Sequence, residues 1–373
     1  MNLSLIIFIN YFASPMLVPI RVLVNGIGTI GKRVAHAVSL QPDMVLVGVS
    51  SPRPSLGVLS SLSRGGVLEG VPFYVRGASP SLFEERGVRV GGVLEDLLGS
   101  GRVDVVVDAA PGGEGLRNRD ELYSRYGVRA VFQGGEPAAV AELTFSPFFN
   151  YGDAFGRRYV RVPSCNTTGI LRVVSALSSL GELREVFVVI ARRAADPADR
   201  KGARLNALSL DGGVPSHHAS DVRTVLPWLN VFTVAVKVPT TLAHLHVARV
   251  RLGGRLSRGD VIEALESHRR IVVAGGEFEA TPDLLEFFRD RRLRGDMYEV
   301  AVLEDSVHVD GEYATLSYVV HQEAVVIPEN IDAVRAMFLG GDPEAGMEAT
   351  DSSLGVTRGR LAPRRALVAA RQS

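Results

Sequence analysis

The stretch IRVLVNGIGTIG, from Ile20 to Gly31, decides the fold of this chain. Residues 20–25 form a short β-branched run that ends in glycine, a pattern that predicts a strand. Apolar residues then recur at helical spacing up to Val38, and a second strand is predicted at Val45–Ser50. Gly-x-Gly-x-x-Gly is a weak motif by itself, but here it lies between a strand and a helix in a unit of about thirty residues. That context predicts a nucleotide-binding βαβ unit.

Each glycine of this motif has its own physical task. Gly26 allows the tight turn after the strand, Gly28 lets a pyrophosphate approach the backbone, and Gly31 lets helix and strand pack closely. The helix N-terminus then faces the phosphates, because its free N–H groups and its dipole favour anions. We expect a dinucleotide to contact these glycines together with Thr29 and Ile30. The alternative is a tight strand–helix turn that binds nothing.

The end of the second strand bears on the choice of cofactor. A strict NAD enzyme usually places Asp or Glu there, for the ribose 2′-hydroxyl. This chain has Ser50, Ser51, Pro52 and Arg53 instead. Nothing in this segment repels a 2′-phosphate, and Arg53 can pair with one. We predict that NADP is accepted, beside NAD or in preference to it; the alternative is that Arg53 is an exposed loop residue.

The rest of the first half continues the same pattern. The apolar run Val103–Ala110 is typical of a buried strand in a parallel sheet, and it leads into the glycine-rich segment around Gly112. Val128–Gly135 predicts another strand with another glycine corner. Glycines at the carboxyl ends of such strands belong to the ligand-binding edge. We therefore expect residues 19–163 to form one Rossmann-type dinucleotide-binding domain, with Gly112 beside the cofactor.

Composition limits what the protein can be. The 373 residues are 46% hydrophobic and 22% charged, which is typical of a globular chain with two or three domains. Lys plus Arg and Asp plus Glu both number 41, so no net charge attracts nucleic acid or a membrane surface. Residues 1–18 are expected to be an extension, with Met16 as the functional start, and their apolar run is too short to span a membrane. Residues 346–373 are expected to be a tail, ending in an arginine-rich segment.

Cys165 is the only cysteine of the chain, which excludes an internal disulfide and a multi-cysteine metal site. It follows a predicted strand, Tyr159–Pro163, and precedes a run of apolar residues at helical spacing. A thiol at a helix N-terminus is expected to have a lowered pKa, because the dipole favours the thiolate. Its neighbours Ser164, Asn166 and Thr167 offer donors for a substrate oxygen. We interpret Cys165 as a nucleophile; a small buried residue is the alternative.

The second half contains two groups of histidines. His244 and His246 share one face of a predicted strand, and a histidine suits the removal of a hydroxyl proton near neutral pH. A metal site from this pair is an alternative that lacks further ligands, so we expect no metal. His217 and His218 lie in what looks like a loop between Asp211 and Ala219, where they are either surface residues or substrate contacts.

A series of motifs follows in one order over about residues 19–340: residues 24–34, 108–113, 132–136, 164–169, 192–197, 215–218, 321–323 and 326–332. With these motifs the chain resembles the archaeal type of phosphorylating glyceraldehyde-3-phosphate dehydrogenase. The resemblance implies an α/β fold, with a Rossmann-type domain followed by a mixed α+β catalytic domain at 164–327. A helix at 328–345 then returns to the first domain.

The resemblance implies oxidation and phosphorylation of D-glyceraldehyde 3-phosphate to 1,3-bisphosphoglycerate, with reduction of NAD or NADP and inorganic phosphate as co-substrate. The Cys165 thiolate attacks the aldehyde, the hemithioacetal loses hydride, and phosphate then attacks the thioester. The first histidine of the His-x-His pair, His244, matches the base of the family. His246 is then a packing or orienting neighbour.

The resemblance also assigns binding residues and an assembly. His217 and His218 contact the substrate or its phosphate, Arg193 lies near the cofactor, and Gln322 meets the nicotinamide amide. The paired arginines Arg192 and Arg193 suit a phosphate, and the alternative is an ion pair with Asp196 or Asp199. For Gln322 the alternative is a surface glutamine. The family implies a homotetramer in the cytoplasm, without nucleic-acid or membrane partners.

Two other functions stay open at this point. A related phosphate-coupled enzyme, such as aspartate-semialdehyde dehydrogenase, also uses a nucleotide fold, a cysteine and a histidine. Its substrate needs a carboxylate clamp, which Ser216-His217-His218 does not resemble. A nucleotide-binding regulator without catalysis is the second alternative, and the presence of both Cys165 and His244 argues against it.

Overall fold

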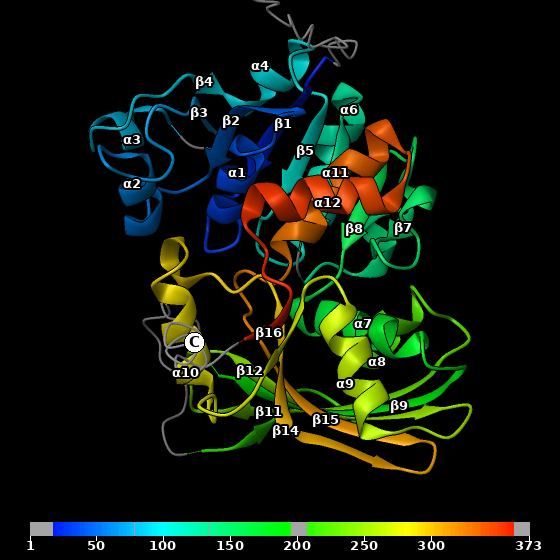
Figure 1. Cartoon of the computed structure of the whole chain (residues 1–373). Coiled ribbons are helices and arrows are strands. Elements are labelled where there is room, and N and C mark those ends of the chain that lie inside the picture. The colour runs from blue at the N-terminus through cyan, green and yellow to red at the C-terminus, as the bar shows by residue number, and fades with distance from the viewer. Residues whose placement is uncertain (1–17, 78, 134, 195–206, 362–373) are drawn as a thin grey trace, which may run out of the picture.

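A computed structural model describes residues 18–77, 79–133, 135–194 and 207–361 of the chain. Two eight-stranded sheets, each with its own helices, lie one above the other in Figure 1. The upper sheet is parallel and the lower one is mixed. The predicted fold class, a Rossmann-type domain plus a mixed α+β domain, is therefore confirmed. Residues 1–17 and 362–373, which hold most of the predicted extension and the arginine-rich end, lie outside the described residues.

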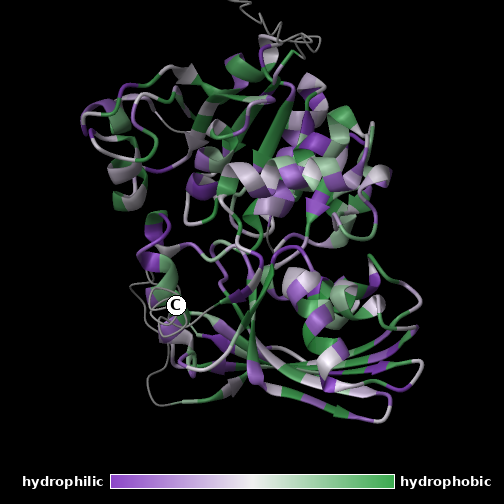
Figure 2. Cartoon of the chain, in the orientation of Figure 1, coloured by the Kyte–Doolittle hydropathy of each residue, from purple (hydrophilic) through white to green (hydrophobic). Residues whose placement is uncertain are grey.

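The first sheet consists of parallel strands and is buried on both faces. Val22 and Val24 of β1 pack into one apolar cluster with residues of α1, while Leu23 packs into another on the opposite face. Strands covered on both faces need nearly continuous apolar sequence, and Figure 2 shows the central strands as hydrophobic. In sheet order the strands are β4 (Gly92–Val93), β3 (Phe73–Val75), β2 (Met44–Ser51), β1 (Ile20–Asn25), β5 (Val105–Asp108), β6 (Arg129–Gln133), β8 (Tyr159–Val162) and β7 (Leu143–Thr144).

Short helices connect these strands, as crossovers between parallel strands require. The glycine motif leads directly from β1 into the first of them, as predicted. They are α1 (Gly31–Ser39), α2 (Leu56–Leu62), α3 (Ser81–Glu84), α4 (Leu94–Gly99), α5 (Glu114–Asn118), the π-helix η1 (Arg119–Tyr123), α6 (Ser124–Tyr126), η2 (Ala138–Val140) and η3 (Gly152–Ala154).

Helices α7, α8 and α9 cover one face of the second sheet, as Figure 1 shows. Helix α10 packs on the opposite face, where Leu284 and Phe288 join one apolar cluster with Val272 and Val319 of the sheet. Its strands, in sheet order, are β10 (Ser209–Leu210), β11 (Asn230–Val238), β9 (Leu183–Arg193), β12 (His244–Leu252), β15 (Tyr313–Val320), β14 (Val300–Asp310), β13 (Ile271–Ala274) and β16 (Gly359–Leu361). Its helices are α7 (Cys165–Ser178), α8 (His217–Arg223), α9 (Arg258–Ser267), α10 (Thr281–Arg289) and η4 (Leu293–Gly295).

The last described elements of the chain pack on the first sheet and then pair with the second. Helix α11 (Ile327–Leu339) packs on α1, β6 and β8, and α12 (Pro343–Leu354) packs on α11. Strand β16 then pairs with β13 of the second sheet. Residues 346–361, predicted as a tail, therefore form most of α12 and all of β16. The reason is burial, because Met347, Leu354 and Leu361 are each at most 7% exposed.

A buried ion pair links the helix after the thiol to this returning segment. Arg172 of α7 and Glu329 of α11 are both nearly inaccessible, and two N–H groups of the guanidinium donate to the carboxylate at 2.7–2.9 Å. Such a pair needs complete partnering to be tolerated away from water. Arg172 also donates to the backbone carbonyls of Tyr298 and Val325. No helix among the described residues is long and apolar enough to cross a membrane.

Candidate active site

The glycine motif forms a cradle at the start of α1. Gly26 has φ +89°, and a side chain there would meet the backbone of Ala109 at 2.9 Å. A side chain at Gly31 would collide with the carbonyl oxygen of Gly26, whereas Gly28 has no neighbour within 4 Å on that side. Two glycines are thus required by close packing, and the third leaves space in front of a helix N-terminus. These residues fit the pyrophosphate of a dinucleotide.

A cavity of about 420 Å³ extends from this cradle along the ends of the strands. Of the predicted cofactor residues, Gly26, Arg53 and Gly112 line it. Ser50, at the end of β2, donates its hydroxyl to Asn25 at 2.7 Å, so this strand offers no carboxylate to a ribose. The remaining lining residues are Asn25, Pro52, Arg76, Gly77, Ala110, Pro111, Glu114 and Arg117.

Arg76 is a basic residue of this cavity that the sequence interpretation missed. It directly follows β3, the strand beside β2, so it reaches the same edge of the sheet as Arg53. The sequence signal for Arg76 is its position directly after a β-strand. That strand, Phe73–Val75, has only three residues and is therefore hard to recognise. At the ends of β2 and β3 the cavity therefore offers Arg53 and Arg76, where a strict NAD site has an acid.

The thiol lies where the sequence predicted it. Cys165 is the first residue of α7, and the preceding Ser164 caps the helix by accepting the N–H of Thr167 at 3.3 Å. Burial raises the pKa of the Cys165 thiol to about 11, although Arg192 and Arg193 act in the opposite direction. The expected lowering is thus wrong for this structure, because the loss of water outweighs the helix terminus and the two cations.

A second cavity, of about 470 Å³, brings the thiol together with many of the other predicted residues. Gly112 and Ala110 line both cavities, so the two adjoin. Arg192, for which the sequence left a phosphate contact and an ion pair open, also faces this space. The predicted residues that line it are Ile30, Gly112, Ser164, Cys165, Asn166, His217, His218 and Gln322.

Other predicted residues line neither cavity: Gly28, Thr29, Gly31, Thr167, Arg193 and His244. Thr167, Arg193 and His244 are buried, each at most 3% exposed. A cavity of about 600 Å³ elsewhere, between residues 147–153, 267–269 and 343–358, contains none of the predicted site residues.

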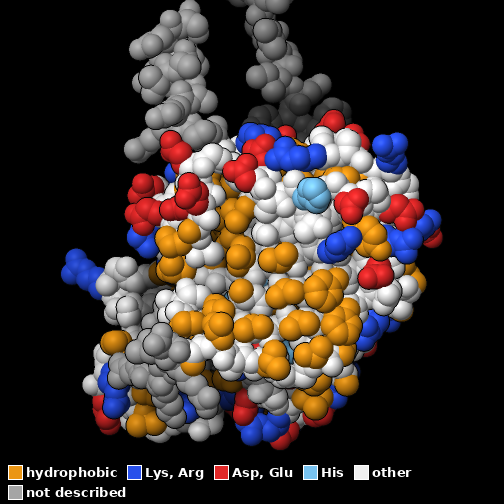
Figure 3. Space-filling model, turned by 90° about the horizontal axis from the view of Figure 1, so that it is seen from below, with side chains coloured by type: hydrophobic (Ala, Val, Ile, Leu, Met, Phe, Trp, Pro, Cys, Tyr) orange, Lys and Arg blue, Asp and Glu red, His pale blue; other side chains and the backbone are white. Residues whose placement is uncertain are grey.

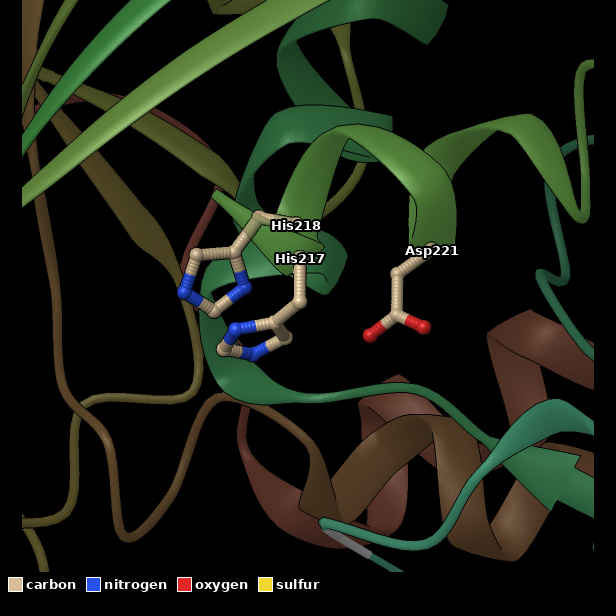
Figure 4. A group of neighbouring side chains, drawn as sticks. All are labelled: His217, His218 and Asp221. Carbon is tan, nitrogen blue, oxygen red and sulfur yellow. The ribbon is translucent and has the colours of Figure 1, made fainter. Parts of the chain in front are cut away.

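His217 and His218 begin helix α8 and do not lie in a loop, which corrects the prediction. The chain turns there because Ser216 is held to Thr233 of β11, and His218, Ala219 and Val222 then face the interior. Figure 4 shows both imidazole rings side by side, with Asp221 apart from them on the same helix.

These three side chains are close enough for a metal, with donor atoms within 4.8 Å of one another. Their atoms have other partners, however. Asp221 pairs with Arg161 at 3.0 Å, and His218 lies 3.4 Å from the Ser164 hydroxyl and 3.3 Å from the Asn166 amide nitrogen. A metal would have to displace these contacts, so the cluster favours hydrogen bonding to a ligand in the cavity.

A chain of polar contacts runs from this cluster into the sheet. His246 lies 2.9 Å from the amide oxygen of Asn166, whose nitrogen faces His218. Burial lowers the pKa of both histidines to about 3, so both rings are neutral near pH 7. The neighbour that His246 contacts is Asn166, so the predicted orienting role of His246 applies to Asn166.

His244 is completely buried at the start of β12. Its Nδ1 accepts the backbone N–H of Arg193 at 3.0 Å, and its Nε2 has no hydrogen-bond partner among the described residues. Burial lowers the pKa of His244 well below its usual value, with His246 and Arg193 acting in the same direction. In the neutral ring the proton therefore resides on Nε2, because Nδ1 is an acceptor.

The two neighbouring arginines have different surroundings. Arg192 is partly exposed and pairs with Asp211, which also binds Lys237 at 2.8 Å. Arg193 is buried and donates to Gln322 at 2.7 Å and to Glu323 at 2.6 Å. The ion pairs considered with Asp196 or Asp199 lie outside the described residues.

Taken together, a parallel sheet with a phosphate cradle and one thiol in the adjoining cavity define a class, the dinucleotide-dependent dehydrogenases that carry a cysteine at the site. Comparison with known proteins identifies the family. Residues 164–325 match the model of the glyceraldehyde 3-phosphate dehydrogenase C-terminal domain.

Relatives cover nearly the whole chain. It is 45% identical to the glyceraldehyde-3-phosphate dehydrogenase of Metallosphaera sedula over 346 residues, which are 92% of this chain and 99% of the relative. It is 47% identical to the enzyme of that name from Methanopyrus kandleri, over 90% of this chain and 97% of the relative. The chain belongs to the glyceraldehyde-3-phosphate dehydrogenase family.

Proposed function

We propose that this chain oxidises D-glyceraldehyde 3-phosphate to 1,3-bisphosphoglycerate, with NADP or NAD and inorganic phosphate. The observation that carries the proposal is the position of Cys165, in a cavity that adjoins the dinucleotide cradle on one side and reaches Arg192 and His218 on the other. The names of the relatives support this activity and not the aspartate-semialdehyde alternative.

Cys165 forms and releases the covalent intermediate. Its thiolate adds to the aldehyde carbon, so a C–S bond forms and the carbonyl oxygen becomes an anion. The bound dinucleotide supplies the hydride acceptor. Loss of hydride from that carbon leaves a thioester on Cys165. An oxygen of inorganic phosphate then attacks the thioester carbon, the C–S bond breaks, and the acyl phosphate leaves with the thiolate restored.

We assign His244 to act on the negative charge that forms on the substrate oxygen. A base must have a free lone pair on the nitrogen that meets the substrate, but the neutral ring carries its proton on Nε2, because Nδ1 accepts the Arg193 N–H. This tautomer supports a donor role toward the oxygen anion that thiolate attack creates. The predicted role as a base requires the other tautomer, and the two roles differ in a measurable way.

The phosphate groups are assigned to the side of the cavity that holds Arg192, His217 and His218. Arg192 supplies the positive charge, since the His218 ring is neutral and contributes hydrogen bonds without charge. Ser164 and Asn166 offer further donors beside the thiol, and Thr167 supports Ser164 from behind. This division of tasks follows the predicted substrate contacts.

At the adenosine end of the cofactor, we propose that the cavity prefers NADP to NAD. Arg53 and Arg76 both face the cavity beside β2, and either guanidinium can pair with a 2′-phosphate. We assign Gly112 to contact with the cofactor, because it lines both cavities. The nicotinamide end is assigned to the cavity with Cys165, where Gln322 lies.

A homotetramer is proposed as the assembly, in the cytoplasm. The face of the second sheet opposite α7, α8 and α9 supports it, because Phe187 of β9 and Phe232 of β11 stack there at 5.9 Å and are 36% and 41% exposed. Figure 3, viewed from below, shows hydrophobic side chains gathered on this face. An apolar area of this kind is typical of a contact with another subunit.

The test of the function is an assay of cofactor reduction with D-glyceraldehyde 3-phosphate, with and without inorganic phosphate. We expect sustained turnover only when phosphate is present. Aspartate semialdehyde serves as the comparison substrate. Turnover of that compound and none with the triose would contradict the proposal.

A further inference from the structure

Arg193 is surrounded by groups of the site without facing the cavity itself. It is the last residue of β9, is 3% exposed, and lies between the first residue of β12 and the segment that follows β15. Its backbone N–H binds Nδ1 of His244, and its guanidinium binds Gln322 and Glu323. One residue therefore contacts both the histidine and the glutamine assigned to the reaction.

The contact between Arg193 and Gln322 decides which hydrogen-bonding group of Gln322 is available to a ligand. The Nε–H of Arg193 donates to Oε1 of Gln322 at 2.7 Å, so the amide oxygen is turned toward Arg193 and the amide nitrogen toward the other side. Gln322 lines the cavity beside Cys165. What it can present to a ligand is therefore its amide N–H, a donor.

The position of Arg193 is itself secured by further contacts. Its Nη1 donates to the Thr241 carbonyl at 3.1 Å and to Glu323 at 2.6 Å. Burial would raise the pKa of Glu323, but His321 and Arg193 hold it at about 2, so the carboxylate stays charged. The guanidinium thus has a fixed partner on one side and orients Gln322 with the other.

We propose that Arg193 is a positioning residue that sets the hydrogen-bonding state of two groups at once. Its side chain holds Gln322 with the amide N–H available to the cavity, and its backbone holds His244 with the proton on Nε2. The inference rests on the proposed function, in which Gln322 meets the nicotinamide carboxamide. It adds that Gln322 recognises the carbonyl oxygen of that carboxamide and not its amino group.

Cofactor analogues separate the two ends of the carboxamide. The 3-acetylpyridine analogue of NADP keeps the carbonyl oxygen and replaces the amino group by methyl. Calorimetric titration of the wild-type protein should give Kd values for NADP and this analogue within about threefold, because only the carbonyl is needed. An analogue that binds more than about thirtyfold more weakly than NADP would overturn the inference.

The variant Arg193→Lys tests the positioning role. A lysine can still pair with Glu323, but it cannot hold Gln322 with a second, fixed N–H. We expect the Kd of NADP to rise about tenfold, while 2′,5′-ADP, which lacks the nicotinamide, binds as before. The KM for NADP should rise with kcat less affected, since the backbone N–H to His244 remains. An unchanged Kd for NADP would contradict the inference.

A matched control is Arg335→Lys, a buried arginine paired with Asp43 away from both cavities. It should lower stability without changing the ratio of the Kd values for NADP and 2′,5′-ADP. If Arg193→Lys does not fold, the double variant Arg193→Met with Glu323→Gln removes both buried charges and provides the same titration. Failure of the proposed function would appear as wild-type protein that does not turn over the triose, whereas failure of this inference leaves turnover intact.

Discussion

The backbone N–H of Arg193 donates a hydrogen bond of 3.0 Å to Nδ1 of His244, which leaves the histidine proton on Nε2. His244→Ala should lower kcat by about 10²–10⁴-fold, with substrate binding kept. His244→Gln places an amide N–H near the same region and should recover most of this loss if the histidine acts as a donor. If Gln is as poor as Ala while the fold is intact, the role of His244 is that of a base.

The thiol of Cys165 should react slowly at neutral pH. Because burial raises its pKa to about 11, the thiolate is a small fraction at pH 7 and grows as the pH rises. We expect the rate of alkylation by iodoacetamide to increase continuously with pH up to about pH 10, without the earlier plateau of an ordinary thiol. A plateau near neutral pH would contradict the structure of the site.

Arg192 should have a measurable effect on the same thiol. Its positive charge lowers the pKa of Cys165 against the effect of burial, so Arg192→Gln should slow alkylation at any fixed pH below that pKa. Arg249→Gln, on the outer face of the second sheet, is the matched control and should not alter the rate. An equal effect of both variants would show that only net charge matters.

The choice of cofactor should depend on Arg53 and Arg76, the arginines of the first cavity at the ends of β2 and β3. Arg53→Ala and Arg76→Ala should each weaken binding of 2′,5′-ADP by about tenfold and leave binding of 5′-AMP unchanged, because charge-assisted contacts to a phosphate are lost. Titration calorimetry at one salt concentration measures this ratio. Two variants with the wild-type ratio would remove both residues from recognition of the 2′-phosphate.

The stability of the protein should depend on the buried pair of Arg172 and Glu329. Arg172→Met leaves a carboxylate without its main partner and should lower the free energy of unfolding by about 3–5 kcal/mol. The double variant with Glu329→Gln removes both charges and should lose less than the sum of the single variants. Guanidinium unfolding measures the three values, and strictly additive losses would contradict this account of the pair.

Features set by local sequence were predictable. The β-branched run Ile20–Asn25 and the helical spacing after it identified β1 and α1, and the space at Gly28 follows from the motif. The position of Cys165 at the start of α7 followed from a strand, a cap and an apolar run. Such signals involve residues that are close together in the chain, so they can be recognised in a single sequence.

Features that depend on distant pairings were not predictable. Arg193 and Gln322 are 129 residues apart, and they meet because β12 lies between β9 and β15. Burial of Cys165 reverses the expected direction of its pKa, and no local pattern reports burial of that kind. The tail prediction failed at residues 346–361 for the same reason, since Met347 and Leu361 are buried by elements far away in the chain.

The most direct test of the account is to trap the intermediate on Cys165. The protein is mixed with D-glyceraldehyde 3-phosphate and NADP without inorganic phosphate, and the peptide that contains Cys165 is examined by mass spectrometry. We predict a burst of reduced cofactor of one equivalent per site and a 3-phosphoglyceryl thioester on that peptide, which disappears when phosphate is added. A burst that persists in Cys165→Ser, or an acyl group on another residue, would contradict the central claim.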